Sequence, residues 1–74
     1  MVEIIKEALV RRPDVERATG LSRSAIYDRL DPKSPRHDST FPRPVNVGSG
    51  ASVRWVASEV AGWVESRIAS RAAA

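Results

Sequence analysis

The stretch of residues 19–27 constrains the fold most, because a helix stop and a helix start lie within a few residues of each other. Gly20 can adopt the left-handed backbone conformation that ends a helix. Leu21 places an apolar side chain in the corner that follows, and the hydroxyl of Ser22 can cap a second helix. This pattern is typical of a helix-turn-helix, which we expect over about residues 13–30.

Proline positions set the outer limits of the two helices. Pro13 suits the first position of a helix, where its missing N–H leaves no bond unmade, so the first helix should cover residues 13–19. Pro32 should stop the second helix, because the residue before a proline is pushed out of helical geometry. The second helix should therefore cover residues 22–30.

The start of the second helix carries side chains that could reach DNA. Ile26 and Leu30 are spaced i,i+4 and should face inward. Arg23, Ser24 and Tyr27 would then project from the N-terminal half, where a recognition helix meets base edges and phosphates. Tyr27 could instead pack over a neighbouring hairpin.

A β-hairpin is expected after a polar loop. Residues 32–40 contain no aliphatic side chain and should form a surface loop, with Phe41 tucked beneath it as an anchor. Alternating segments on either side of a glycine-rich turn predict a hairpin over about residues 44–56. The period of two sends Asn46 and Arg54 to the outer face, and it predicts four core-facing residues: Val45, Val47, Val53 and Trp55.

Two flanking segments complete the expected fold. Leu9 and Val10 form a short apolar pair that could join the hairpin as a brief strand. A closing helix over about residues 57–70 has apolar positions at i, i+3, i+4 and i+8, namely Val60, Trp63, Val64 and Ile68. Both tryptophans should lie in the core, because each can bury about 150–250 Å². The alanine-rich residues 69–74 should fray.

The length of the chain allows one small core. A domain of 74 residues buries only about 60% of the surface of its unfolded chain, so we expect a single domain over residues 1–74 with a core of about residues 9–70. The sequence has no cysteine, no secretory signal pattern and no apolar run near the roughly 20 residues of a membrane span. These features predict a cytoplasmic protein, associated with the nucleoid if it binds DNA.

The net positive charge of the chain comes from its middle segment. Residues 1–31 carry six basic and six acidic side chains, and residues 57–74 carry two of each. Residues 32–56 therefore hold the whole net charge of +3, with Asp38 opposed by Lys33, Arg36, Arg43 and Arg54. A polyanion would be steered to this segment, although a solvated loop without acidic residues explains the pattern equally well.

The sequence offers no catalytic constellation. The single histidine, His37, lies in the polar loop without a nucleophile partner, and no spacing of His, Asp and Glu would hold a metal. The glycine pair of the hairpin joins two strands and does not open a helix, as a phosphate-binding loop would. We therefore expect no enzymatic activity, no cofactor and no bound metal.

Several of these segments, taken in order, resemble the AlpA family of phage regulatory proteins over about residues 9–68. They are the Thr19–Tyr27 turn, the Pro32–Arg36 loop, the Phe41-Pro42-Arg43-Pro44-Val45 segment and the stretch from Val53 to Trp63. The resemblance implies a winged helix-turn-helix, mainly α with a small β-hairpin, comprising three helices and a two- or three-stranded antiparallel sheet.

The resemblance also implies a function. Proteins of this type bind double-stranded DNA of prophages and integrative elements, at an integrase promoter or an attachment site. Some activate transcription of the integrase gene, and others act as excisionases that bend attachment-site DNA and direct excision. Integrase is a possible partner, and a monomer with few basic residues should need self-association or repeated sites for useful affinity.

The resemblance places the recognition helix at residues 22–30 and the wing at residues 48–52. The wing tip lacks the basic residue that many wings insert into the minor groove, so Arg43 or Arg54 would supply its charge. Together with the charge pattern, this predicts nine DNA-contacting residues: Ser22, Arg23, Ser24, Tyr27, Lys33, Arg36, Arg43, Ser49 and Arg54. Ser22 is more a cap than a reader of bases.

Alternatives remain open at this point. Arg54 could pair with Glu59, and Asp28 could accept from a cytosine amine, orient a neighbouring arginine or face away from DNA. The whole chain could also be a protein-interaction module, in which the closing helix or the segment of residues 2–5 contacts integrase or RNA polymerase and DNA binding is weak.

Overall fold

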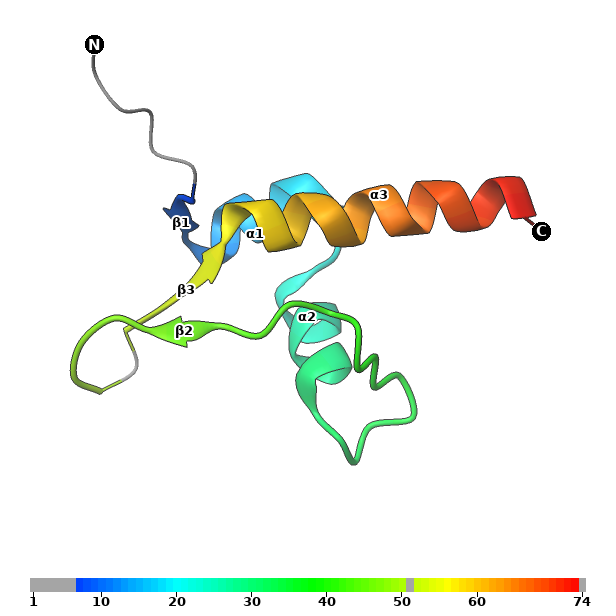
Figure 1. Ribbon diagram of the computed structural model, residues 1–74. Coiled ribbons are helices and arrows are strands. Elements are labelled where there is room, and N and C mark those ends of the chain that lie inside the picture. The colour runs from blue at the N-terminus through cyan, green and yellow to red at the C-terminus, as the bar shows by residue number, and fades with distance from the viewer. Residues whose placement is uncertain (1–6, 51, 74) are drawn as a thin grey trace, which may run out of the picture.

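The computed structural model describes residues 7–50 and 52–73 of the chain. Within these residues three helices and a three-stranded antiparallel sheet follow one another in the order β1 (Leu9–Val10), α1 (Arg12–Thr19), α2 (Arg23–Leu30), β2 (Val45–Asn46), β3 (Val53–Val56) and α3 (Ala57–Ala73) (Figure 1). The predicted fold class, a mainly helical winged helix-turn-helix, is confirmed. The expectation for residues 2–5 lies outside the described residues.

The helix-turn-helix forms through local caps. The Asp14 carboxylate accepts a hydrogen bond from the Arg11 backbone N–H at 3.1 Å, which begins α1 one residue earlier than predicted. Gly20 has φ 74° and ends α1, donating its N–H to the Glu16 carbonyl oxygen at 2.8 Å. Ser22 Oγ accepts from the Ala25 N–H at 3.2 Å and caps α2. Both capping predictions are confirmed.

The sheet has the order β1-β3-β2, with β3 in the centre and leading directly into α3. In the β1–β3 pair, Val10 lies opposite Trp55 and Leu9 opposite Val56. The expected strand at Leu9–Val10 therefore exists and pairs with the hairpin. This pairing holds the start of α1 next to the end of the hairpin, which positions the site described below.

The predicted orientation of β2 is wrong. Val45 pairs with Arg54 and Asn46 with Val53, and directly opposed side chains share one face of a sheet. Val45 and Val47 therefore lie on the face away from Trp55, and they are 41% and 44% exposed. A shift of one residue in register exchanges the faces of a whole strand.

The hydrogen bonds of the turn explain this register. The Asn46 side chain donates to the Gly50 carbonyl oxygen and accepts from the Gly48 N–H, both at 3.0 Å. Beside them, the Val47 N–H donates to the Ser52 carbonyl oxygen at 2.9 Å. The turn sets the register of a hairpin. The bonds of this turn therefore fix a register that places the two valines beside Asn46 on the outer face, although their alternation with Asn46 predicted the inner face.

The core lies between the helices and the inner face of β3. Its buried residues are Val15, Ile26, Phe41, Trp55 and Val60, and three of them, Val15, Ile26 and Trp55, are completely buried. Trp63 is only half-buried and packs edge-to-face on Phe41, with the ring centroids 4.9 Å apart. The predictions for Trp55 and Phe41 are confirmed, whereas Trp63 lies at the edge of the core.

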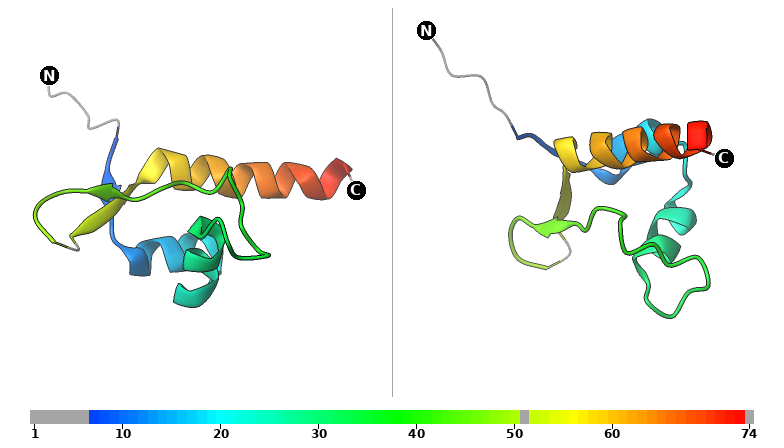
Figure 2. Two further views of the ribbon diagram at one scale, coloured as in Figure 1. Left: turned by 90° about the horizontal axis from the view of Figure 1, so that it is seen from below. Right: turned by 45° about the vertical axis from the view of Figure 1, so that its right-hand side comes forward.

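Helix α3 is longer than predicted: it runs to Ala73, whereas an end near residue 70 was expected. Alanine is the best helix former, which favours continuation of the last turns. The helix packs along α1 near its own start and then extends past the rest of the molecule (Figures 1 and 2). Ile68, in the C-terminal half of α3, is 52% exposed, so it is not part of the core. No helix in the described part of the chain is long and apolar enough to cross a membrane.

Candidate nucleic-acid interface

The first two turns of α2 present the side chains predicted to read DNA. Arg23, Ser24 and Tyr27 are exposed, whereas Ile26 of the same helix is buried. The Arg23 guanidinium lies over the Tyr27 ring, 5.8 Å from its centroid, which holds the two side chains together. Ser22 acts as the cap of the helix, as expected.

Tyr27 packs against the hairpin, as one of its two alternatives predicted, and part of its side chain stays exposed. Its ring packs edge-on against Trp55 of the hairpin, with the centroids 6.5 Å apart, and the residue is still 39% exposed. The aromatic body thus rests on the core while part of the side chain faces solvent. This arrangement is typical of tyrosines that lie at a binding surface.

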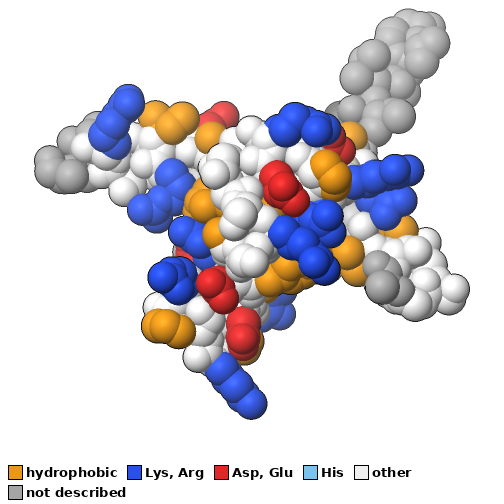
Figure 3. Space-filling view, turned by 180° about the vertical axis from the view of Figure 1, so that it is seen from behind, with side chains coloured by type: hydrophobic (Ala, Val, Ile, Leu, Met, Phe, Trp, Pro, Cys, Tyr) orange, Lys and Arg blue, Asp and Glu red, His pale blue; other side chains and the backbone are white. Residues whose placement is uncertain are grey.

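A basic hollow of about 310 Å³ lies where the start of α1, the first turns of α2 and β3 meet. We call it the arginine hollow, and four arginines line it: Arg11, Arg12, Arg23 and Arg54. The view from behind shows Lys and Arg side chains spread over this face of the molecule, with a few acidic side chains between them (Figure 3). The sheet creates the hollow, because pairing of β1 with β3 brings residues 11 and 12 beside residue 54.

The arginines of the hollow differ in how many of their N–H groups already have partners within the protein. Arg12 Nε donates to the Glu16 carboxylate at 2.9 Å, and this bond raises the pKa of Arg12 above its ordinary value. Arg54 donates one N–H to the Val53 carbonyl oxygen at 2.9 Å. Among the described residues no ion pair joins Arg54 to Glu59, so that alternative is not supported. Arg54 keeps further donors for an anion.

Sequence reasoning missed Arg11 and Arg12 as candidate contact residues. They were counted only as charges in the balanced segment of residues 1–31. The available signal was a basic pair directly before Pro13, at the start of a helix that precedes the recognition helix. Their proximity to Arg23 and Arg54 depends on the β1–β3 pairing, which residue spacing alone does not reveal.

The remaining predicted residues are exposed but lie away from the arginine hollow. Lys33 and Arg36 follow the C-terminal end of α2, Arg43 precedes β2, and Ser49 lies in the wing turn. Arg36 pairs loosely with Asp28 at 3.7 Å, which fits the alternative in which Asp28 orients an arginine. The structure therefore separates the nine predicted residues into a group at the start of α2 and β3 and a dispersed group.

Comparison with known proteins places the chain in a family. The family described as "Prophage CP4-57 regulatory protein (AlpA)" matches residues 8–68, from the residue before β1 to the C-terminal half of α3. The chain belongs to the AlpA family of phage regulatory proteins.

Two relatives support this assignment to the AlpA family. The chain is 44% identical over 59 residues to the DNA-binding transcriptional activator AlpA of Escherichia coli (strain K12), an overlap that covers 80% of this chain and 83% of that protein. It is 39% identical over 69 residues to the uncharacterized protein ORF88 of Enterobacteria phage P4, covering 93% of this chain and 70% of that protein. No solved structure matches the chain.

Proposed function

We propose that this chain is a sequence-specific double-stranded DNA-binding protein of a prophage or integrative element that regulates transcription. One observation carries the proposal: the capped recognition helix α2 presents Arg23 at the rim of a hollow lined by three further arginines. The relative from Escherichia coli is named a DNA-binding transcriptional activator, which agrees with this assignment. The target would be the promoter of an integrase gene or of excision genes.

In this proposal α2 and the arginine hollow have different roles in DNA binding. Arg23 projects from the first turn of α2, where a guanidinium can make a bidentate contact with O6 and N7 of guanine. Arg11, Arg12 and Arg54 would bind phosphates beside it and so fix the position of α2 on the duplex. Sequence preference would come from α2, and most of the affinity from the arginine hollow.

Further phosphate contacts along the duplex would come from four residues outside the hollow: Lys33, Arg36, Arg43 and Ser49. Such a small interface supplies limited affinity, because a single module buries only about 600–1,000 Å² on DNA. We therefore propose that the protein binds repeated sites cooperatively, by self-association or together with integrase. Bending of attachment-site DNA, as by an excisionase, is the second activity that such an arrangement would allow.

The test is a fluorescence-anisotropy titration of labelled duplexes from the integrase promoter and the attachment site of the element, at about 50 mM and about 200 mM salt. Phosphate contacts by Arg11, Arg12 and Arg54 alone predict that affinity falls about 40-fold between these concentrations, from a slope of about −0.9 per contact. Further contacts by Lys33, Arg36 and Arg43 would increase this fall to about 1,800-fold. Binding that is absent or insensitive to salt would refute the DNA-binding assignment. A circular-permutation assay on the same fragments measures bending and separates excisionase from promoter regulator.

Two substitutions distinguish the residue that reads sequence from a residue that binds only phosphate. Arg23→Ala should weaken binding and cost about 1–3 kcal/mol of discrimination at one base pair, whereas Lys33→Ala should weaken binding equally on all sequences. Arg17→Ala serves as the matched control, because this exposed α1 arginine pairs with Asp14 and does not line the hollow. If Arg23→Ala keeps both affinity and sequence preference, α2 is not the recognition helix.

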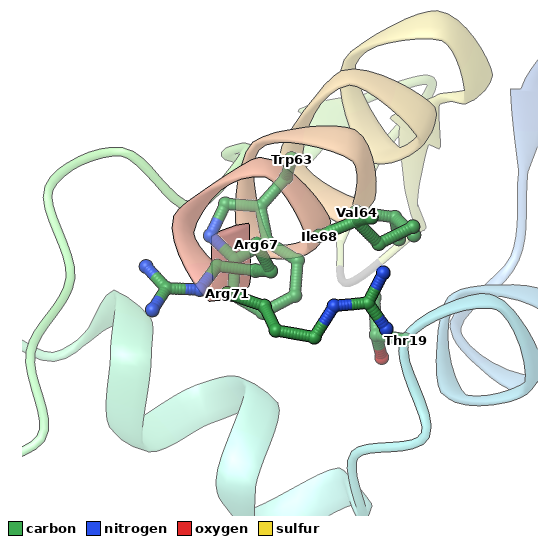
Figure 4. Close-up of a pocket in the computed structure, with 6 residues that line it drawn as sticks. All are labelled: Thr19, Trp63, Val64, Arg67, Ile68 and Arg71. Atoms are coloured by element: carbon green, nitrogen blue, oxygen red, sulfur yellow. The ribbon is translucent and has the colours of Figure 1, made fainter. Parts of the chain in front are cut away.

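A protein-interaction role is the second candidate, and one observation favours it. A hollow of about 330 Å³ lies between the end of α1 and the C-terminal half of α3, lined by Val64 and Ile68 together with Arg67 and Arg71 (Figure 4). Integrase or RNA polymerase could contact this surface. Under this reading Ile68→Asp would abolish promoter activation or excision and leave DNA affinity unchanged.

A further inference from the structure

A second basic hollow lies at the other end of the recognition helix. It has a volume of about 610 Å³ and is enclosed by the last turn of α2, the loop of residues 35–39 and α3. One arginine comes from each of these segments: Arg29, Arg36 and Arg67. We call it the loop hollow, and it shares no lining residue with the arginine hollow.

The walls of the loop hollow are held in place by hydrogen bonds between the three segments. The Asp38 N–H donates to the Arg29 carbonyl oxygen at 2.9 Å, which ties the loop to the end of α2. The Trp63 indole N–H donates to Asp38 Oδ2 at 3.1 Å, which ties the same loop to α3. Phe41 packs edge-to-face against the ring of the same Trp63. The three arginines therefore project from a pre-formed frame, which lowers the entropic cost of binding a ligand.

The guanidinium groups of the loop hollow have few partners of their own. Arg29 donates one bond to the Ala25 carbonyl oxygen at 3.1 Å, and Arg67 lies over the Trp63 ring at 6.0 Å. Within residues 7–50 and 52–73 neither takes part in an ion pair, and Arg36 has only its loose 3.7 Å pair with Asp28. Most donors of these three side chains thus remain available.

Asp38 is the one acidic residue that lines the loop hollow, and its oxygens already have donors. It accepts from the backbone N–H and the hydroxyl of Thr40 as well as from the Trp63 indole. Three guanidiniums against one engaged carboxylate leave the hollow with an excess of positive charge, and His37 adds a further polar group. None of the three arginines is part of the buried core.

We propose that the loop hollow binds a phosphate group through Arg29, Arg36 and Arg67. A guanidinium presents paired N–H donors that match two oxygens of a phosphate, and several arginines around one hollow can share its charge. The phosphate could belong to the backbone of the duplex held by α2 or to a free phosphorylated molecule. Only the first source rests on the DNA-binding function proposed above.

The test uses the intact chain and sodium pyrophosphate as the ligand, at constant ionic strength. The indole N–H resonance of Trp63 should shift in a saturable way, because this group forms part of the wall. The indole of Trp55 is the internal control, because it is buried and bonds to the Pro42 carbonyl oxygen. The double variant Arg36→Ala, Arg67→Ala should bind pyrophosphate at least tenfold more weakly.

Arg71→Ala is the matched control, since Arg71 lies one turn after Arg67 on α3 and does not line the loop hollow. An unshifted Trp63 resonance in the unmodified protein, or an equal loss of affinity in Arg71→Ala, would overturn the proposal. Far-ultraviolet circular dichroism of each variant shows that its fold is intact, and the single variants Arg36→Ala and Arg67→Ala replace the double variant if it unfolds.

Addition of a specific duplex distinguishes the two sources. If the phosphate belongs to the bound DNA, pyrophosphate competes with the duplex, and the double variant lowers the salt slope of DNA binding by about one for each lost contact. If the ligand is a free phosphorylated molecule, pyrophosphate binds equally well with and without DNA. Arg23→Ala in the same assay tests the DNA-binding proposal separately, because Arg23 lies outside the loop hollow.

Discussion

Replacement of Gly20 by alanine tests whether the helix-turn-helix depends on a left-handed residue. Gly20 has φ 74° and ends α1 immediately before the cap of α2. A Cβ built at this position would meet no atom within 4 Å. A methyl group therefore causes no clash with neighbouring residues, and the effect of the substitution comes from the backbone conformation alone.

The magnitude follows from two opposing terms. A non-glycine residue in the left-handed conformation costs about 1–2 kcal/mol. Alanine also lowers the entropy of the unfolded chain relative to glycine, which stabilises the folded state by about 0.4–1 kcal/mol. We expect a net loss of about 1 kcal/mol, which in a domain of this size lowers the melting temperature by about 4–8 °C.

Gly62→Ala is the matched control, with the opposite expected sign. Gly62 lies inside α3, a Cβ there also meets nothing within 4 Å, and its φ is not positive. Alanine in a helix interior should raise stability by about 0.5–1 kcal/mol. Urea unfolding, followed by far-ultraviolet circular dichroism, measures the stability of both variants. Equal changes of the same sign in the two variants would refute the conformational explanation.

Two further predictions concern hydrogen bonds of single side chains. Ser22→Ala should destabilise the fold by about 0.5–2 kcal/mol in urea unfolding, because it removes the cap of α2. Ser24→Ala, at an exposed position in the first turn of the same helix, should change the stability by less than about 0.5 kcal/mol. Similar losses in the two variants would show that the cap contributes nothing. The hydrogen bond from the Thr40 hydroxyl is the main cause that lowers the pKa of Asp38. Ionised Asp38 therefore stabilises the folded state above its ordinary pKa, and this contribution is lost as the pH falls through the lowered value. The urea midpoint of the unmodified protein should drop more steeply below about pH 4 than that of Asp38→Asn, and parallel curves would contradict this.

Local sequence signals were sufficient to locate the helix-turn-helix. The stop at Gly20, the cap at Ser22 and the limit at Pro32 act within three or four residues, so the printed order of side chains contains the whole interaction. The strand at Leu9–Val10 and the anchor role of Phe41 were also predictable, because each is an isolated apolar feature beside a polar stretch.

The hairpin and the interface depended on tertiary structure. The apolar alternation of β2 favoured a core-facing Val45, but the hydrogen bonds of Asn46 in the turn set a register that turns Val45 outward. Likewise, no local pattern places residues 11 and 12 beside residue 54, since only the β1–β3 pairing joins them.

The sequence by itself determined where α2 begins and ends and which of its side chains are exposed. The tertiary structure decided which charges surround it. The net charge of the chain lies in residues 32–56, yet the arginine hollow draws two of its four arginines from the balanced segment before α1. Charge summed along a chain ignores contacts between distant residues, and a binding surface is made of such contacts.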